Sequence, residues 1–423
     1  MALPSTRVLL VQNQCLSRSL CRLQIDTLQI SRWIVKYGTR RQYSIAQSTP
    51  ANSEILSDDP PRLVTPLEEA KRFMIDCFKA VGTPQDHAEI VSENLLEADY
   101  RGHYSHGMNR LEMYIRDIQG GSTDAKAEPA VLKETVATAL VDGKNGLGAV
   151  VGRRCMDLAI KKAKEVGIGF VVARGSNHYG IAGKYALQAI DEGLLGLSFT
   201  NTSPFMTPTR AKTATLGTNP LSLGAPANNG DSFVLDMATT AVAVGKIELA
   251  RRKHEPIPEG WALNDEGMPE TNPTIAYKSG KLMPLGGSEL NSGYKGYGLG
   301  MLVEIFCGIL SGSAYGPHVR KWGQSTELAN LGQAFMAIDP NAFAPGFEDR
   351  MSDLIDYTRN LEPANPEKPV LVHGDKENHH MEKVNNEGGL RYVENQHKTN
   401  EKLAEELKVK PMTSKTVDLP SDE

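Results

Sequence analysis

The chain contains 423 residues, of which 40% are hydrophobic and 23% are charged, and its formal net charge is −5. This composition is ordinary for a soluble globular protein and leaves room for two or three domains. Outside its basic N-terminus the chain is acidic, which argues against nucleic acid as a partner, and it lacks the roughly 18 consecutive apolar residues of a membrane span.

The first 45 residues form a basic leader. They contain seven Lys and Arg residues against a single acid, Asp26, with Ser, Leu and Ile scattered between them. This pattern is typical of a mitochondrial transit peptide, and RRQYS, residues 40–44, is a plausible cleavage region. A disordered basic tail is the alternative. We therefore expect a mature protein of the mitochondrial matrix that begins with a polar linker over residues 46–63.

Helices are predicted in the first part of the mature chain. Thr65-Pro66-Leu67-Glu68 combines a capping box with Pro at the first helical position, and similar punctuation recurs at residues 83–86. A third helix is expected to start at Ser105 and to stop at residues 120–121, two glycines. A polar helical segment at residues 400–408 must pack against another part of the fold.

From about residue 136 the pattern changes to short apolar runs separated by glycines. VATALVDG, GIGFVVARG, LLGLSFTNT and SFVLDMATT are typical of strands in a sheet that is covered on at least one face. Helical segments lie between them, and a further helix is predicted over residues 294–312. The sequence therefore predicts an α/β domain.

A glycine-rich segment, VDGKNGLGAVVG, lies where a dinucleotide fingerprint could stand. That fingerprint also needs an acid at the end of the next strand, about 20 residues on, but the next strand ends in Arg174. We therefore interpret the glycines as a structural turn.

The segment RGHYSHGMNR, residues 101–110, holds candidate catalytic groups. If Ser105 caps the third helix, His106 and Arg110 share one helix face. The helix dipole and the guanidinium would then keep His106 neutral and able to exchange a proton, while Arg110 could bind a carboxylate through two hydrogen bonds. A capped helix with surface charges is the alternative interpretation. A metal-dependent hydrolase using His103 and His106 is a rival, but HExxH or a comparable ligand set is missing.

Two later polar segments follow predicted strands. Asn177 and His178 lie in a turn after the strand at residues 168–173, where α/β proteins often bind ligands. Asp236 ends another strand, and Thr239 or Thr240 could cap the next helix, so that backbone amides could meet a phosphate or an amide. Local turn hydrogen bonds and helix capping explain these segments equally well.

Taken together, the segments resemble the malate/L-lactate dehydrogenase-like family of NAD(P)-dependent oxidoreductases. The resemblance covers residues 63–376 and rests on seven motifs in family order. These are RGHYSHGMNRLEMYI, SNHYGIAGKYA, LGTNPLSLGAP, VLDMATTAVAVGKI, GWALNDEGMPETNP, PLGG and GYKGYGLGMLVEIFCGILSG.

The resemblance implies an α/β fold that is not a Rossmann fold. A helical domain built from both chain ends, residues 64–135 and 336–410, would enclose an inserted cofactor-binding domain, residues 136–335. Residues 411–423 would form a disordered tail. The family's late proline-glycine-acidic turn reads HGD at residues 373–375, and the polar segment after it, with His379 and His380, is interpreted as an exposed tail. No metal site is expected.

The resemblance also implies roles for individual residues. His106 and His178 are the two candidates for the acid/base group, and Arg110 would bind the substrate carboxylate. Asp236 completes the expected catalytic set, and Ser105 and Asn177 would contact the substrate. The residues expected to bind the cofactor are Asn201, Thr202, Asp236, Met237, Ala238, Gly286, Gly287, Gly374 and Asp375.

The expected reaction is reversible hydride transfer between C2 of a small 2-hydroxy acid, of the malate or L-lactate type, and NAD or NADP. The expected assembly is a homodimer, as in the family. Reduction of cyclic imino acids or diketo acids on the same fold is an alternative, because the same carboxylate clamp and acid/base pair would serve. A catalytically silent metabolite-binding homologue is a second alternative.

Overall fold

The computed structural model describes residues 63–324 and 326–416, so the predicted transit peptide and nearly all of the predicted linker lie outside the described residues. The α-helices of the described part are α2 (Leu67–Ala80), α3 (Gln85–Tyr100), α4 (Leu111–Gln119), α5 (Gly148–Val166), α6 (Gly183–Ile190), α7 (Val244–Lys253), α8 (Pro273–Ser279), α9 (Gly293–Glu304), α10 (Phe347–Arg359), α11 (Asp375–Glu387) and α12 (Glu394–Leu407). Short helical turns are η1 (Tyr104–His106), η2 (Met108–Arg110), η3 (Asn228–Gly230), η4 (Ile305–Ile309), η5 (Gly316–His318) and η6 (Pro340–Ala342). The strands are β1 (Leu63–Val64), β2 (Ala130–Glu134), β3 (Thr138–Asp142), β4 (Ile168–Ser176), β5 (Leu195–Thr200), β6 (Leu221–Pro226), β7 (Ser232–Met237), β8 (Ala262–Leu263), β9 (Pro269–Glu270), β10 (Lys281–Leu282), β11 (Leu331–Ile338) and β12 (Lys415–Thr416).

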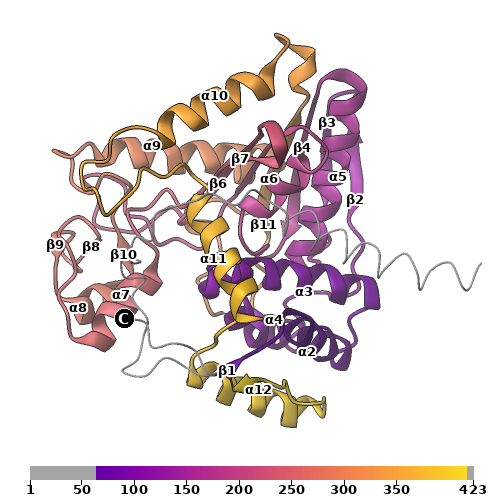
Figure 1. Cartoon of the computed structure of the whole chain (residues 1–423). Coiled ribbons are helices and arrows are strands. Elements are labelled where there is room, and N and C mark those ends of the chain that lie inside the picture. The colour runs from indigo at the N-terminus through magenta and orange to yellow at the C-terminus, as the bar shows by residue number, and fades with distance from the viewer. Residues whose placement is uncertain (1–62, 325, 417–423) are drawn as a thin grey trace, which may run out of the picture. The chain divides into compact units, whose positions relative to one another are not determined.

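A seven-stranded sheet in the order β2-β3-β4-β11-β5-β6-β7 forms the centre of the described fold (Figure 1). Only β3 and β4 pair in parallel, and the other neighbours are antiparallel. A dinucleotide-binding doubly wound sheet is mostly parallel. The sheet therefore confirms the predicted α/β class and the prediction that the fold is not a Rossmann fold.

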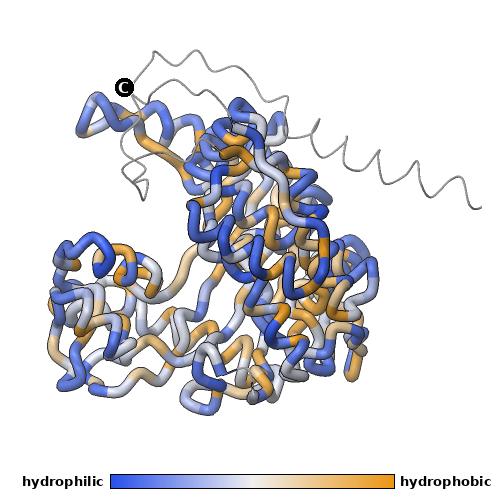
Figure 2. Tube along the Cα trace, turned by 90° about the horizontal axis from the view of Figure 1, so that it is seen from below, coloured by the Kyte–Doolittle hydropathy of each residue, from blue (hydrophilic) through white to orange (hydrophobic). Residues whose placement is uncertain are grey.

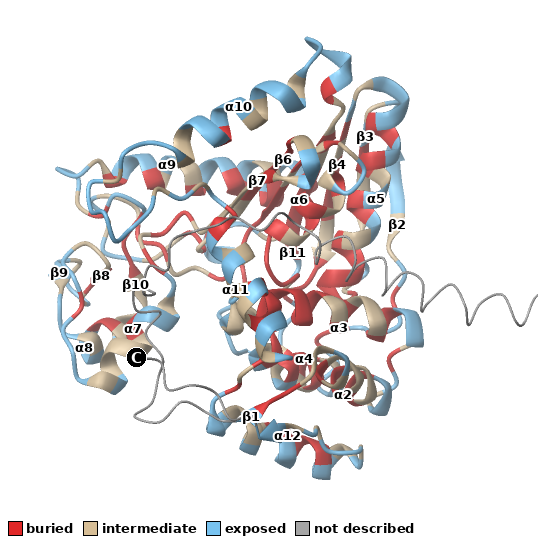
Figure 3. Ribbon diagram, in the orientation of Figure 1, coloured by how far each residue is buried: buried red, intermediate tan, exposed pale blue. Residues whose placement is uncertain are grey.

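Helices cover both faces of this sheet. On one face, Val171 and Phe335 pack with α5 and α6. On the other face, Val172 and Phe199 pack with the α9–η4 segment through Val303 and Cys307. Buried residues concentrate in the central strands and in α3, α5 and α6, while α10 and α12 are largely exposed (Figure 3). The apolar runs of β4 and β11 reflect burial on both faces.

The two ends of the described part of the chain meet in a helical layer beside α2, α3 and α4. There β1 pairs with β12, α12 packs on α2, and α11 packs on α3. Hydrophobic and hydrophilic residues alternate along these helices, as expected for helices with one buried face (Figure 2). Residues 411–416, which the sequence assigned to a disordered tail, include β12.

The predicted domain boundaries do not coincide with breaks in the structure. The boundary at 135/136 separates β2 from β3, which are paired, and the boundary at 335/336 lies within β11. Helix α10, which was assigned to the helical domain, packs on β6 and β7 of the sheet. The division into two domains stays a prediction.

The interpretation of residues 377–397 as an exposed tail is wrong. They lie in α11, in the loop after it and in the first turn of α12. Met381 and Val384 of α11 are buried, and Tyr104 contacts the His380 ring. The sequence is polar because only a narrow stripe of this helix is covered.

The predicted capping by Thr65 is also not observed. Pro66 precedes α2, while the Thr65 backbone pairs with Leu390 and its hydroxyl bonds Ser414. The second helix likewise follows Pro84 without a side-chain cap. Among the described residues, no helix is both long enough and apolar enough to cross a membrane.

Candidate active site

His106 lies in a 3-10 turn, η1, and not in the first turn of an α-helix. Ser105 does not cap a helix, and its hydroxyl oxygen lies 2.9 Å from Nδ1 of His106. The buried carboxylate of Asp99 accepts the Met108 N–H instead, at 2.8 Å. A Cβ at Gly107 would lie 1.8 Å from Asp99 Oδ1, so this close approach requires glycine. The local sequence was thus misinterpreted because a distant carboxylate binds the turn.

His178 follows β4 and lies against His106, with 5.7 Å between the two ring centroids. Its Nδ1 is 2.6 Å from the Tyr114 hydroxyl and 3.4 Å from the Gly180 backbone nitrogen. A backbone N–H can only donate, so Nδ1 of His178 is an acceptor. The neutral ring then carries its hydrogen on Nε2.

Both histidines are held in the neutral form. Burial, aided by the positive charge of Arg110 and by His103, lowers the pKa of His106 to about 3. Burial also lowers the pKa of His178 well below its ordinary value, with His106 and Arg110 acting in the same direction. The predicted neutrality of His106 is confirmed, but it arises from burial and Arg110 and not from a helix dipole.

Arg110 lies beside the two histidines and under an indole ring. Its guanidinium carbon is 5.2 Å from the centroid of Trp322, and the same indole makes an edge contact with His178. The Nε atom of Arg110 is buried without a hydrogen-bond partner. An orphaned guanidinium donor is costly unless an anion satisfies it, which suits a substrate carboxylate.

Two adjacent hollows meet at His178. The first is lined by Tyr114, Asn177 and the start of α5, and the second by Thr202, Ser203 and Trp322. Asp117 borders both hollows and accepts a hydrogen bond from Arg320 at 3.0 Å. This ion pair joins α4 to the loop that carries Trp322.

The side-chain nitrogen of Asn177 bonds the neighbouring glycine-rich turn and is not free to contact a ligand. Its amide nitrogen donates to Gly146 O at 2.8 Å and to Asn145 O at 3.1 Å. A Cβ at Gly148 would lie 2.2 Å from Asn177 O. The glycine-rich segment is therefore a structural turn, as predicted, and it lets α5 begin directly against the His178 loop. The Oδ1 atom of Asn177 remains without a partner and lies beside the first hollow.

Asp236 ends β7 and accepts the Gly183 N–H at 2.7 Å. Burial raises the pKa of its carboxyl to about 7, and the nearby Glu377 acts in the same direction. Glu377 also lies 3.5 Å from Nε2 of His103, so His103 belongs to the surroundings of the site. The structure connects Asp236 to the start of α6, and a catalytic role for it stays a prediction.

The residues predicted to bind the cofactor gather around the end of β7. Met237 and Ala238 are half-buried there. Val234 N bonds His373 O next to Gly374, and Leu285 N bonds Thr239 O next to Gly286 and Gly287. Thr202 reaches the same region through Thr218, whose backbone nitrogen donates to the Thr202 hydroxyl at 2.9 Å.

Two of the predicted cofactor residues are engaged within the protein. The Asn201 side chain bonds Glu304, Ala314 and Gly332 and is completely buried. The Asp375 carboxylate receives two hydrogen bonds from Arg359. Neither side chain is available to a cofactor without breaking these bonds.

Sequence reasoning did not assign a role to Tyr114 or Trp322. Tyr114 falls within the predicted third helix, and its spacing from Arg110 places it one helical turn further on. Trp322 lies in a loop without a recognisable pattern, and only the tertiary structure brings it to His178.

Comparison with known proteins identifies the family to which the chain is similar. Residues 65–399 match the malate/L-lactate dehydrogenase family. The chain is 43% identical to a malate dehydrogenase of Pyrococcus abyssi over 314 residues, which cover 74% of this chain and 86% of the relative. It is 40% identical to an L-sulfolactate dehydrogenase of Methanocaldococcus jannaschii over 299 residues, which cover 70% of this chain and 84% of the relative.

Solved structures show the same fold. The malate dehydrogenase from Pyrococcus horikoshii OT3 superposes with a TM-score of 0.77 at 37% identity, covering 86% of this chain and 100% of that chain. More distant relatives include enzymes named for NADP(+) or NAD(+) and a Δ(1)-pyrroline-2-carboxylate reductase.

Proposed function

Because the chain belongs to the malate/L-lactate dehydrogenase family of oxidoreductases, we propose that it interconverts a small 2-hydroxy acid and its 2-oxo acid with NAD or NADP. Malate is the leading substrate. The observation that carries the proposal is the cluster of two neutral histidines against a guanidinium whose Nε is buried without a partner. This combination provides an anion clamp beside a group that exchanges protons.

Arg110 would bind the substrate carboxylate. The face of Trp322 lies over the guanidinium, so the indole limits the positions that Arg110 can adopt. A planar guanidinium binds a carboxylate through two parallel hydrogen bonds, which fixes the orientation of the adjoining C2 atom. Trp322 is thus a positioning residue for this clamp.

His178 would exchange the proton at the substrate oxygen. With Nδ1 accepting from Tyr114 and Gly180, the Nε2–H can donate to a carbonyl oxygen during reduction. During oxidation Nε2 must accept, which requires the neutral tautomer with the ring hydrogen on Nδ1, donated to the Tyr114 oxygen. The ring would become an imidazolium by taking the hydroxyl proton, and this conjugate acid would return the proton during reduction. His106, whose Nδ1 faces the exposed Ser105, would support the His178 ring by stacking.

The residues around the end of β7 fit a dinucleotide. Small side chains and glycines meet there, and Gly286, Gly287 and Gly374 have φ values of 95°, 69° and 107°, a region that favours glycine. Glycine at these positions leaves no side chain to obstruct a ligand. A bound nicotinamide dinucleotide would accept the hydride from C2 or return it. Ala238, Met237 and Thr202 would line its site.

The test is oxidation of NADH and NADPH by the purified chain with oxaloacetate, pyruvate, sulfopyruvate and Δ(1)-pyrroline-2-carboxylate. We expect turnover with a linear 2-oxo acid. Activity with the cyclic imine alone would establish the imino acid reductase instead. Absence of turnover with the whole panel and both nucleotides would leave a metabolite-binding homologue and overturn the proposed enzyme.

A homodimer is part of this proposal. Helix α9 and η4 carry an exposed apolar stripe in which Leu302, Ile305 and Ile309 expose 38%, 50% and 53% of their surface. Such a stripe on a soluble protein is typical of an interface. Light scattering should give twice the chain mass, and Ile305→Glu should shift the protein toward the monomer.

Import into the mitochondrial matrix is the remaining part of the proposal, and the basic composition of residues 1–45 supports it. A fluorescent protein fused behind residues 1–62 should enter mitochondria. The same fusion with the leader arginines replaced by glutamine should stay outside.

A further inference from the structure

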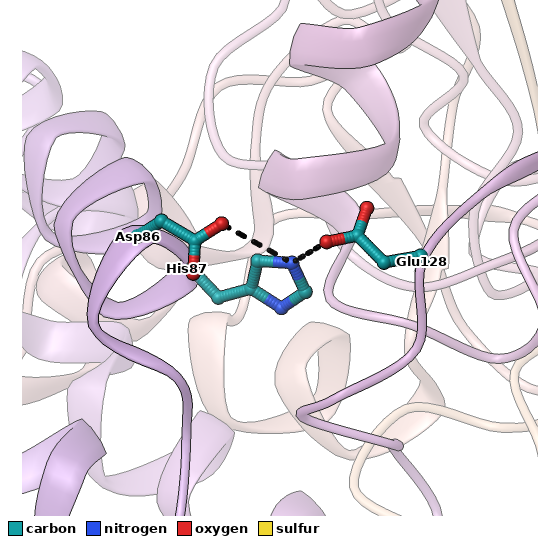
Figure 4. Close-up of side chains that lie close together, drawn as sticks. All are labelled: Asp86, His87 and Glu128. Carbon is teal, nitrogen blue, oxygen red and sulfur yellow. Dashed lines mark hydrogen bonds and ion pairs between the residues drawn. The ribbon is translucent and has the colours of Figure 1, made fainter. Parts of the chain in front are cut away.

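A second histidine environment lies away from the hollows at His178, where the chain enters α3. His87 is 1% exposed, and its ring stands between the carboxylates of Asp86 and Glu128 (Figure 4). Glu128 lies in the segment before β2 and is 41 residues further along the chain than His87. These three are a cluster of possible metal ligands among the described residues.

The hydrogen bond at Nδ1 decides what Nε2 can do. Nδ1 of His87 is 2.9 Å from Ala125 O, and a carbonyl oxygen can only accept, so Nδ1 carries a hydrogen. A neutral imidazole then has a lone pair on Nε2. A histidine that ligates a metal ion usually donates its other ring N–H to a carbonyl or carboxylate in this way.

Nε2 nevertheless faces two further acceptors. It lies 2.9 Å from Glu128 Oε1 and 4.0 Å from Asp86 Oδ2. A lone pair and two carboxylates that point at one another repel unless a proton on Nε2 or a metal cation lies between them. In the described part of the chain, Arg154 lies near the cluster, with its guanidinium 3.9 Å from Asp86. Its side chain is 46% exposed, so it does not lie between Nε2 and the carboxylates.

We propose that Asp86, His87 and Glu128 bind a divalent transition-metal ion of the zinc class. The three ligand atoms lie within 4.8 Å of one another. Ligands of tetrahedral zinc are about 3.4 Å apart for bonds of about 2.1 Å, and the separations of 2.9 and 4.0 Å bracket that value. Both carboxylate side chains are 59% exposed and can adjust, and water completes the coordination.

The ion would stabilise the fold and take no part in hydride transfer. It would join the start of α3 to the segment that contains Ala125 and Glu128. That segment holds the Asn145 turn, through Asp124 N to Asn145 O at 2.9 Å and Asn145 Nδ2 to Ser122 O at 2.9 Å. Asn145 O in turn accepts from Asn177, the neighbour of His178.

The experiment measures zinc binding by the metal-stripped chain in competition with a chromophoric chelator. One equivalent should bind to the wild type. His87→Gln should weaken binding by at least about 100-fold, and Glu128→Gln and Asp86→Asn by at least about 10-fold. Glu89→Gln removes a carboxylate from the same helix outside the cluster and should bind like the wild type. His178→Gln should also bind like the wild type, which separates this site from zinc captured by the catalytic histidines.

Thermal unfolding supplies an independent readout. Zinc in excess should raise the unfolding midpoint of the wild type and of Glu89→Gln but not of Glu128→Gln, whose change lies on the surface and leaves the fold intact. Unchanged zinc affinity in Glu128→Gln and His87→Gln would overturn the site. So would a metal-stripped chain that takes up no zinc and shows, by nitrogen NMR, hydrogens on both ring nitrogens of His87. Neither result depends on the dehydrogenase activity.

Discussion

His178 and His87 are both enclosed by the fold, yet opposite partners at Nδ1 give them different chemistry. At His178 Nδ1 accepts from Tyr114 and Gly180, so Nε2 presents a hydrogen. At His87 Nδ1 donates to Ala125 O, so in the neutral ring Nε2 would present a lone pair to two carboxylates. The comparison indicates that the hydrogen-bond partner of Nδ1 decides whether Nε2 of an enclosed histidine is suited to proton exchange or to cation binding.

The sharpest way to separate the two histidines is to remove each one. His178→Gln should lower turnover by at least about 100-fold, the loss typical of an acid/base group. His87→Gln should keep turnover within about twofold in the presence of zinc. Steady-state rates with the substrate of the wild type measure both. A His178→Gln enzyme that retains full turnover while His106→Gln does not would transfer the proton role to His106.

The next effect concerns the anion clamp, which has no counterpart at His87. Arg110→Gln should lower kcat/KM by about 10- to 100-fold, because a hydrogen bond to a charged group contributes roughly 1.5 to 3 kcal/mol. Trp322→Leu should show the same direction with a smaller loss. Added guanidine should partly restore Arg110→Ala if the loss is that of the guanidinium. Circular dichroism is the control: a variant that has lost its fold owes its low activity to unfolding and not to the missing anion clamp.

The pH dependence of the free energy of unfolding tests whether the fold holds His106 neutral. The folded pKa of His106 is about 3, below the ordinary value of 6.5, so the unfolded chain binds a proton that the folded chain excludes. Its contribution to stability is therefore fully present above pH 6.5 and is lost as pH falls, by about 1.4 kcal/mol per pH unit.

The measurement must compare variants, because two aspartates act in the opposite direction. The pKa of Asp99 and that of Asp236 are raised to about 7, so both favour the fold at low pH. Urea unfolding between pH 7 and pH 5 should show that His106→Gln loses less stability than the wild type. Parallel pH profiles for the two proteins would contradict the buried neutral ring.

The smallest effect concerns the hydrogen bond at Nδ1 of His178. Tyr114→Phe removes a donor 2.6 Å from that nitrogen and should lower turnover by about 5- to 10-fold, the equivalent of roughly 1 kcal/mol. It should also raise the pH at which turnover begins to fall, because the ring gains basicity. A higher KM with unchanged kcat would contradict this role and would indicate that Tyr114 only packs against the site.

The local sequence was sufficient where a short segment decides its own structure. The apolar runs that became β3, β4, β5 and β7 were recognised from their pattern, and so was the long helix that became α9 and η4. Periodicity and glycine boundaries act over a few residues and depend little on the rest of the chain. The start of the third helix was predicted wrongly because the turn before it is held by Asp99. The Asp99 carboxylate accepts the Met108 N–H nine residues away, and no regular sequence pattern marks this contact.

By itself the sequence determined the α/β class, the absence of a dinucleotide fingerprint and the motifs that contain His106, Arg110 and His178. Only the tertiary structure decided that Arg110 and His178 meet at Trp322 with His106 against His178, and that Asn201 and Asp375 are engaged inside the protein. It also decided that Glu128 reaches His87 across 41 residues. Such contacts depend on burial and on the direction of individual hydrogen bonds, which neighbouring letters in a sequence do not encode.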